Sequence, residues 1–169
     1  MHDKAEPLLQ VDPSRFRHAL GSFATGVAVV TTLAADGKKS GITINSFNSV
    51  SLEPPLLLWS VANNARSCDT FVQARYFAVQ VLSSQQQSLA RLFASKDDDK
   101  FSGMLCSEGI GGVPLLRDYA ACFECETEHV YAGGDHKIIV GRVLKLDDNE
   151  TDPLVFYRGH FIDDVKPKA

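Results

Sequence analysis

The densest group of hydrogen-bonding side chains in this sequence lies between two apolar stretches, in the segment from Gly41 to Pro55. Its hydroxyl and amide residues are Thr43, Asn45, Ser46, Asn48, Ser49 and Ser51, and two prolines end it. Buried polar groups are costly unless they are paired. The cluster therefore indicates either a bound polar, planar partner or a solvated loop, and both interpretations stay open on this segment alone.

Two further groups of residues could bind a ligand. Arg66 and Ser67 precede an expected helix, whose free N–H groups and dipole favour a phosphate. The turn 133–136 presents His136, and a histidine titrates near neutral pH and can donate a hydrogen bond from either ring nitrogen. Taken alone, the first group is more often an ordinary helix cap and the second more often an ordinary turn residue, so neither identifies a site by itself.

Three other motifs carry less weight. Cys122 and Cys125 form a CxxC pattern inside an expected strand, where residues three apart face opposite sides and do not easily chelate one metal. The glycine-rich segment 109–114 lacks the third glycine and the flanking strand and helix of a dinucleotide fingerprint. The acidic run 97–99 lacks the spaced ligands of a calcium loop. We therefore predict no metal site.

The bulk composition limits the class of protein. The 169 residues fit one domain, and we treat 1–169 as that domain with a flexible N-terminal extension over 1–11. A net charge of −4 argues against a nucleic-acid partner. No segment has the ~18 consecutive apolar residues that a membrane span requires, and no signal-type apolar core follows the charged N-terminus. These features predict a cytoplasmic protein.

The elements that must position the candidate residues are mostly strands. Asp12 followed by Pro13 is typical of a helix start, and a second helix is expected over 67–74. A third begins at Ser84, with Gln87 completing a capping box, and ends near residue 94, before a charged loop over 95–103. A strand buried on both faces is expected over 26–33. Further strands are expected over 56–61, 76–82, 119–131, 137–147 and 154–158. Long strands at hairpin spacing with few short helices favour an antiparallel β-barrel.

Several segments, in this order along the chain, resemble the short-chain flavin reductases of two-component monooxygenases. They are Phe23–Thr32, Thr43–Pro55, Arg91–Ala94, Lys100-Phe101, Gly134–His136 and Tyr157–Gly159. Each motif is weak alone, but their joint order and spacing is specific, and the resemblance runs from about Phe16 to Phe161. It implies a mainly β, Greek-key-like, flavin-binding split barrel that forms a homodimer.

The resemblance also implies site residues. The isoalloxazine and ribityl chain of FAD or FMN would be bound by Thr43, Asn45, Ser46 and Ser49. The phosphate end of the flavin would be held by Ser67, Cys68, Arg91, Phe93, Ala94, Ser95 and Lys100. His136 would be the catalytic residue, orienting the nicotinamide of NADH rather than serving as an obligatory acid, with Tyr157 and Arg158 beside it. The expected cofactor-binding set is completed by Ile44, Val50, Ser60, Arg66 and Phe101.

The implied activity is hydride transfer from NADH to a flavin, which then leaves as reduced flavin for a separate monooxygenase acting on an aromatic compound. The alternatives are a flavin- or haem-binding split barrel without turnover, and a pyridoxamine-phosphate oxidase-like enzyme, which would be expected to show a more basic phosphate pocket. The choice between FAD and FMN stays open.

Overall fold

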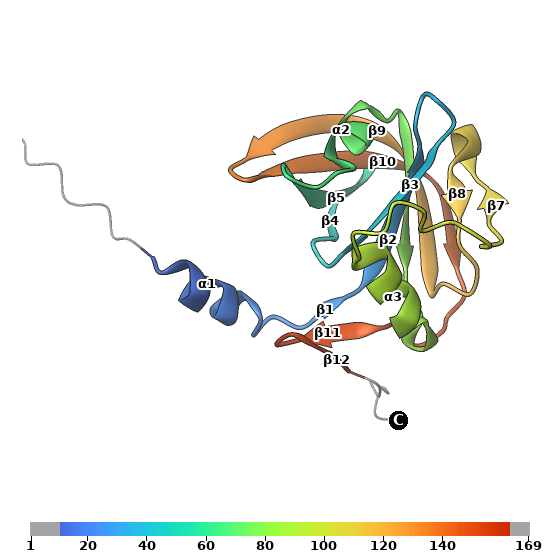
Figure 1. Ribbon diagram of the computed structural model, residues 1–169. Helices are drawn as coiled ribbons and strands as arrows, with labels where there is room; N and C mark the ends of the chain where they lie inside the picture. Colours follow the sequence, from blue (N-terminus) through green and yellow to red (C-terminus); the bar gives the residue numbers. More distant parts are fainter. Residues whose placement is uncertain (1–10, 163–169) are drawn as a thin grey trace, which may run out of the picture.

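The computed structural model describes residues 11–162, and most of them form antiparallel strands (Figure 1). In chain order the helices are α1 (Pro13–Leu20), α2 (Cys68–Gln73) and α3 (Gln87–Ala94), with short 3₁₀ turns η1 (Ser84–Gln86) and η2 (Ile110–Gly112). The main strands are β2 (Ala28–Leu33), β3 (Lys39–Ile44), β4 (Asn48–Leu52), β5 (Pro55–Ala62), β6 (Tyr76–Val81), β9 (Ala121–Gly133) and β10 (His136–Asp148). The shorter ones are β1 (Thr25–Gly26), β7 (Ser107–Glu108), β8 (Pro114–Leu115), β11 (Val155–Tyr157) and β12 (His160–Ile162). None of the helices within 11–162 has the length and apolar character that crossing a membrane requires.

The seven main strands form one sheet in the order β3-β2-β6-β9-β10-β5-β4. Strand β2 is buried on both faces, as its continuous apolar sequence predicts. Ala28 and Val30 belong to the interior cluster around Trp59, whereas Val29 packs on the other face with residues of α3. The sheet therefore separates two hydrophobic layers, and α3 covers the outer one.

The sheet curves until β3 and β5 approach each other, although they are not paired. Ser46, just after β3, makes two hydrogen bonds across this gap. Its hydroxyl oxygen accepts from the amide of Ser60 at 2.9 Å and donates to the Ser60 carbonyl at 3.2 Å. A side chain thus replaces a ladder of backbone bonds where the barrel closes, which is the predicted split-barrel arrangement.

A buried polar network fixes the other side of the sheet. The Gln80 amide donates to the Thr31 hydroxyl at 2.9 Å, and that hydroxyl donates to the Pro114 carbonyl at 2.6 Å. The Gln80 side-chain oxygen accepts from the Leu116 amide. Because Gln80 and Thr31 are fully buried, these bonds satisfy groups that would otherwise be costly, and they tie β2, β6 and β8 together.

The long hairpin of β9 and β10 extends further than the sequence predicts. Both strands reach the turn at 134–135, so His136 is the first residue of β10, paired with Gly133 and Ala62. Cys122 and Cys125 on β9 lie in different hydrophobic clusters, which confirms that they face opposite sides of the sheet. Burial raises the pKa of both thiols.

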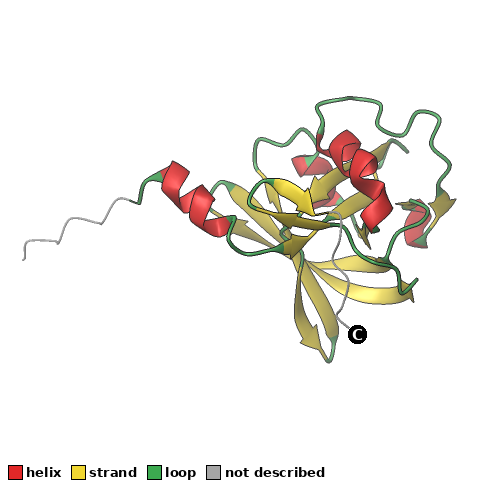
Figure 2. Cartoon of the chain, turned by 90° about the horizontal axis from the view of Figure 1, so that it is seen from below, coloured by secondary structure: helices red, strands yellow, loops and turns green. Residues whose placement is uncertain are grey.

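The N-terminal helix stands apart from the barrel. In Figure 1 α1 projects from the small sheet β1-β11-β12, and the view from below in Figure 2 shows the same separation. Asp12 caps it as predicted, accepting a hydrogen bond from the Arg15 amide at 2.8 Å, and Pro13 is its first residue. All its residues are exposed. The predicted flexible extension 1–11 lies outside the described residues except for Val11.

Three local predictions are wrong in detail. The capping box is formed by Ser83 and Gln86 rather than Ser84 and Gln87, because the chain leaves β6 one residue earlier than expected. Ser67 precedes α2, but its side chain makes no capping bond. The polar bend after β3 is short, because Asn48–Leu52 pairs with β5 as the edge strand β4.

The close approach of β3 to α3 generates a stability prediction. A Cβ on Gly41 would overlap the ring of Phe93 and lie 3.1 Å from Phe101, whereas one on Gly26 would meet nothing within 4 Å. Gly41→Ala is expected to lower the free energy of unfolding by about 1–3 kcal/mol through overpacking, measured by urea denaturation. Gly26→Ala is the matched control, and equal destabilisation by both changes would contradict the argument.

Candidate functional site

Two cavities lie along β3, and Ile42 lines both of them. We name the first the cationic cavity; it has a volume of about 520 Å³ and lies between β3, the start of α2 and the loop after α3. The second, the histidine cavity, has a volume of about 490 Å³ and lies where β3, β5 and β10 meet. Each is large enough for part of a nucleotide-sized ligand.

The histidine cavity is lined by the residues around the closure of the barrel. Four predicted residues from the polar segment reach it, namely Thr43, Ile44, Asn45 and Ser46, and Ser60 and His136 lie opposite. The Thr43 hydroxyl donates to the carbonyl of Ala90 in α3 at 2.7 Å, so it can only accept a hydrogen bond from a ligand. The hydroxyl of Ser46 is already engaged in the two hydrogen bonds to the backbone of Ser60. Among these residues Asn45 is exposed on the cavity wall, and its amide offers both a donor and an acceptor.

His136 is held by its neighbour in the chain. Its Nδ1 lies 2.7 Å from a carboxylate oxygen of Asp135, and the hydrogen bond from His136 lowers the pKa of that carboxyl. An ionised carboxylate only accepts hydrogen bonds, so Nδ1 carries the hydrogen. The other nitrogen, Nε2, remains available to a ligand, and the imidazole is half exposed.

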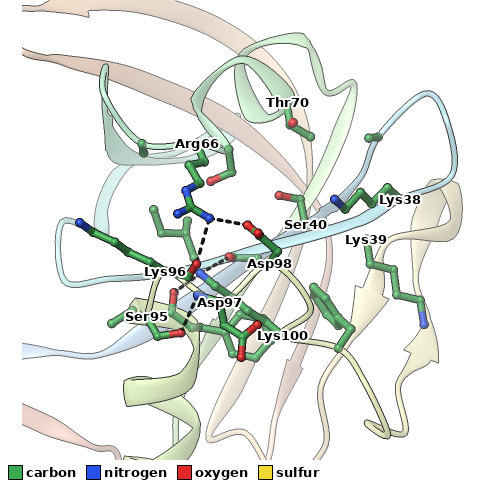
Figure 3. A pocket seen from close by; sticks show the side chains of 18 of the residues that line it. Lys38, Lys39, Ser40, Arg66, Thr70, Ser95, Lys96, Asp97, Asp98 and Lys100 are labelled. Carbon is green, nitrogen blue, oxygen red and sulfur yellow. Dashed lines mark hydrogen bonds and ion pairs between the residues drawn. The ribbon is translucent and has the colours of Figure 1, made fainter.

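The cationic cavity has a charge opposite to that of the whole chain. Its basic side chains are Lys38, Lys39, Arg66, Lys96 and Lys100, against the acidic Asp36, Asp97 and Asp98. Figure 3 shows Arg66, Asp98 and Lys100 close together, with Lys38 and Lys39 on the neighbouring hairpin. A local excess of positive charge in a protein of net charge −4 favours an anionic ligand.

Lys100 is the most enclosed of these cations. Its ammonium donates to the Phe93 carbonyl at 2.8 Å and lies 3.5 Å from the Gly41 carbonyl. Burial lowers the pKa of Lys100, nearby Arg66 lowers it further, and Asp97 opposes the shift. A phosphate placed here would compensate two cations that now repel each other.

The structure brings seven of the predicted cofactor-binding residues together at the cationic cavity. These are Arg66, Ser67, Phe93, Ala94, Ser95, Lys100 and Phe101. Cys68 is not among them, because it is buried in the interior cluster with Phe71. The rings of Phe93 and Phe101 meet edge to face, with centroids 5.1 Å apart.

Five other predicted residues line neither cavity. Ser49 and Val50 are exposed on the edge strand β4. The guanidinium of Arg91 lies over the ring of Phe161, 5.1 Å from its centroid. Arg158 lies over Tyr157 and hydrogen-bonds the Ser22 hydroxyl at 3.3 Å, near α1. The binding roles of these residues and of Cys68 stay predictions.

Sequence reasoning missed several lining residues, namely Lys38, Lys39, Ser40, Asn64, Thr70, Lys96 and Ile138. Lys38 ends the hairpin turn 35–38 and Lys39 begins β3, and this pair of charges was the available signal. Because this turn reaches the cavity only through the curvature of the sheet, local sequence could not show its proximity to Arg66. No group of three or more His, Cys, Asp or Glu side chains suited to a metal ion occurs in residues 11–162.

Comparison with known proteins places the chain in a family. Residues 20–163 match the family described as flavin reductase like domain. A flavin reductase of Pseudomonas putida is 41% identical over 152 residues, which cover 89% of each chain. The reductase subunit HsaB of a flavin-dependent monooxygenase from Rhodococcus jostii is 42% identical over 89% of this chain and 77% of its own. Some relatives are longer: the chain spans 48% of one from Rhizobium meliloti that is 42% identical.

A solved structure agrees with these matches. The NADH:FAD oxidoreductase SgcE6 of Streptomyces globisporus, in complex with NAD and FAD fragments, superposes with a TM-score of 0.86 and 35% identity. The match covers 96% of this chain and 99% of that one.

The chain therefore belongs to the flavin reductase-like domain family. This membership confirms the resemblance found in the sequence, the split-barrel fold and the enzyme class, an oxidoreductase of the flavin reductase type.

Proposed function

We propose that this protein uses NADH to reduce FAD or FMN and supplies the reduced flavin to a separate monooxygenase that acts on an aromatic compound. One observation carries the proposal. A cavity with an excess of cations adjoins, at Ile42, a cavity with polar and apolar walls that contains His136. A flavin nucleotide has the matching shape, with a flat ring system at one end and phosphate at the other.

The described residues divide into three sets by what they offer the ligands. The flavin phosphate would be held by Arg66, Ser67, Ser95 and Lys100. The wall from Ile42 to Ser46 would lie along the isoalloxazine, with Asn45 hydrogen-bonding its polar edge. His136 would orient the nicotinamide through Nε2, because Asp135 fixes Nδ1.

When both are bound, NADH supplies the hydride and the flavin ring accepts it. The protein's contribution is to hold the two rings at a reacting distance of ~3–3.5 Å and to exclude misoriented poses. Donors along the polar segment would stabilise negative charge as it develops. The hydrogen bonds between Ser46 and Ser60 hold this wall against β5.

The test is NADH oxidation, followed at about 340 nm with FAD, FMN and riboflavin in parallel, since the cofactors carry the chemistry. We expect turnover that depends on protein, NADH and flavin together. Flavin binding without NADH oxidation would instead support a carrier or sensor. Oxidation of pyridoxamine phosphate without NADH would support the oxidase-like alternative.

A variant tests the role of His136. His136→Ala is expected to raise the KM for NADH roughly tenfold, the size expected for losing one or two ligand hydrogen bonds, and to leave flavin affinity nearly unchanged. His129→Ala is the matched control, because His129 is exposed on β9 and lines neither cavity. An unchanged KM for NADH in His136→Ala would reject the role.

We also propose that the protein is a homodimer in the cytoplasm. The support for a dimer is the resemblance, together with Phe16, Leu20 and Phe23, which are 55%, 58% and 76% exposed at α1 and just after it. Such a cluster of exposed apolar side chains is typical of an interface. All four cysteines are free thiols, which suits a reducing compartment.

Replacing Phe16 and Leu20 together by serine is expected to shift the protein from dimer to monomer, measured by size-exclusion chromatography with light scattering. Buried apolar side chains at the centre of an interface often contribute about 2 kcal/mol or more to the free energy of binding, which is about 30-fold in affinity. Leu105→Ser is the control, since Leu105 is 70% exposed on a different part of the chain. A wild-type protein that elutes as a monomer would contradict the proposal.

A further inference from the structure

The guanidinium of Arg66 is already occupied by an acidic loop of the same chain. Its Nη1 donates to the carbonyl of Lys96 at 2.9 Å and forms an ion pair with the Asp98 carboxylate. Figure 3 shows both interactions at the cationic cavity, with Lys100 nearby. The cation expected to meet a ligand phosphate is thus neutralised from within the protein.

The loop that carries Asp98 is held mainly by short-range contacts. Ser95 donates to the Leu92 carbonyl at 2.7 Å and accepts from the Asp97 amide at 3.2 Å. The Asp97 side chain accepts from the Asp99 amide at 3.1 Å. Beyond these, Arg66 is the contact that draws Asp98 toward the cavity. The Asp98 side chain is 82% exposed, so it can turn into solvent at little cost.

A phosphate and the Asp98 carboxylate are competitors for the same site. Both are anions that a guanidinium binds through charge-assisted hydrogen bonds, and two anions placed side by side repel each other. An entering phosphate must therefore displace Asp98 from Arg66 or bind beside it at a disadvantage. In either case the carboxylate lowers the affinity of the cavity for phosphate.

We propose that Asp98 is an affinity-determining residue, an internal counter-ion that competes with the flavin phosphate for Arg66 and returns to it when the flavin leaves. The inference rests on the proposed function, since a reductase that releases its flavin needs moderate rather than tight binding. It assigns to Asp98, the middle residue of the acidic run 97–99, a role that the sequence pattern does not reveal.

The test compares ligands with and without a phosphate. Asp98→Asn removes the competing carboxylate and is expected to lower the Kd of FMN by about three- to tenfold. This is the size expected when the phosphate no longer has to break one exposed ion pair and is no longer repelled by the carboxylate. The Kd of riboflavin, which has no phosphate, is expected to stay the same. Binding is measured by quenching of flavin fluorescence at low salt, and the gain in FMN affinity is expected to shrink as salt is added.

Asp99→Asn is the matched control. It changes the net charge of the same loop by the same amount, but Asp99 does not line the cavity, and we expect both Kd values to stay at wild-type level. A second control combines Asp98→Asn with Arg66→Gln, where removing the carboxylate is expected to give no gain. Thermal melts of each variant separate these effects from loss of folding.

Each of the following results would overturn the inference. Equal changes for FMN and riboflavin would mean that Asp98 acts on loop structure rather than on phosphate. An equal gain in Asp99→Asn would indicate general charge alone. A gain for NAD⁺ instead of FMN would assign the cation to the other nucleotide. If wild-type protein binds no flavin, the proposed function and this inference fail together, whereas wild-type turnover with an unchanged FMN Kd in Asp98→Asn rejects the inference alone.

Discussion

The two hydrogen bonds between Ser46 and the backbone of Ser60 are the constraint on which the site depends. They join β3 to β5 where the sheet would otherwise stay open. A full ladder at this point would seal the barrel, because neighbouring strands lie only ~4.8 Å apart. A single side-chain link holds the strands near each other and leaves space for a ligand between them. The cavity beside His136 lies at this junction and is lined by residues of both segments, including Ser46 and Ser60.

Sequence patterns were sufficient where the determinants are local. Asp12 and Pro13 set the start of α1, and the continuous apolar run of β2 predicts burial on both faces. The identities of the candidate site residues came from the resemblance rather than from local physics. Before the resemblance, the polar segment after Gly41 supported two interpretations equally well.

Other features depend on contacts between distant parts of the chain, and local sequence could not supply them. Lys38 reaches the cavity with Arg66 because the sheet curves, not because of any spacing between them. Arg91 belongs to a motif of the family, yet in this structure its guanidinium lies over Phe161. The strand β4 was missed because its polar residues suit a loop, whereas pairing with β5 makes them an edge strand. In each case tertiary packing decided among conformations that the sequence allowed.

The position of Ile42 has a consequence for how such an enzyme can change. Ile42 lines both cavities, so a substitution there alters both walls at once. Evolution and protein engineering therefore have little freedom to reshape one cavity without disturbing the other at this residue. Independent adjustment has to begin at the far ends of the site, near Lys38 on one side or near His136 on the other. The shared residue couples the shapes of two cavities that are otherwise lined by different residues.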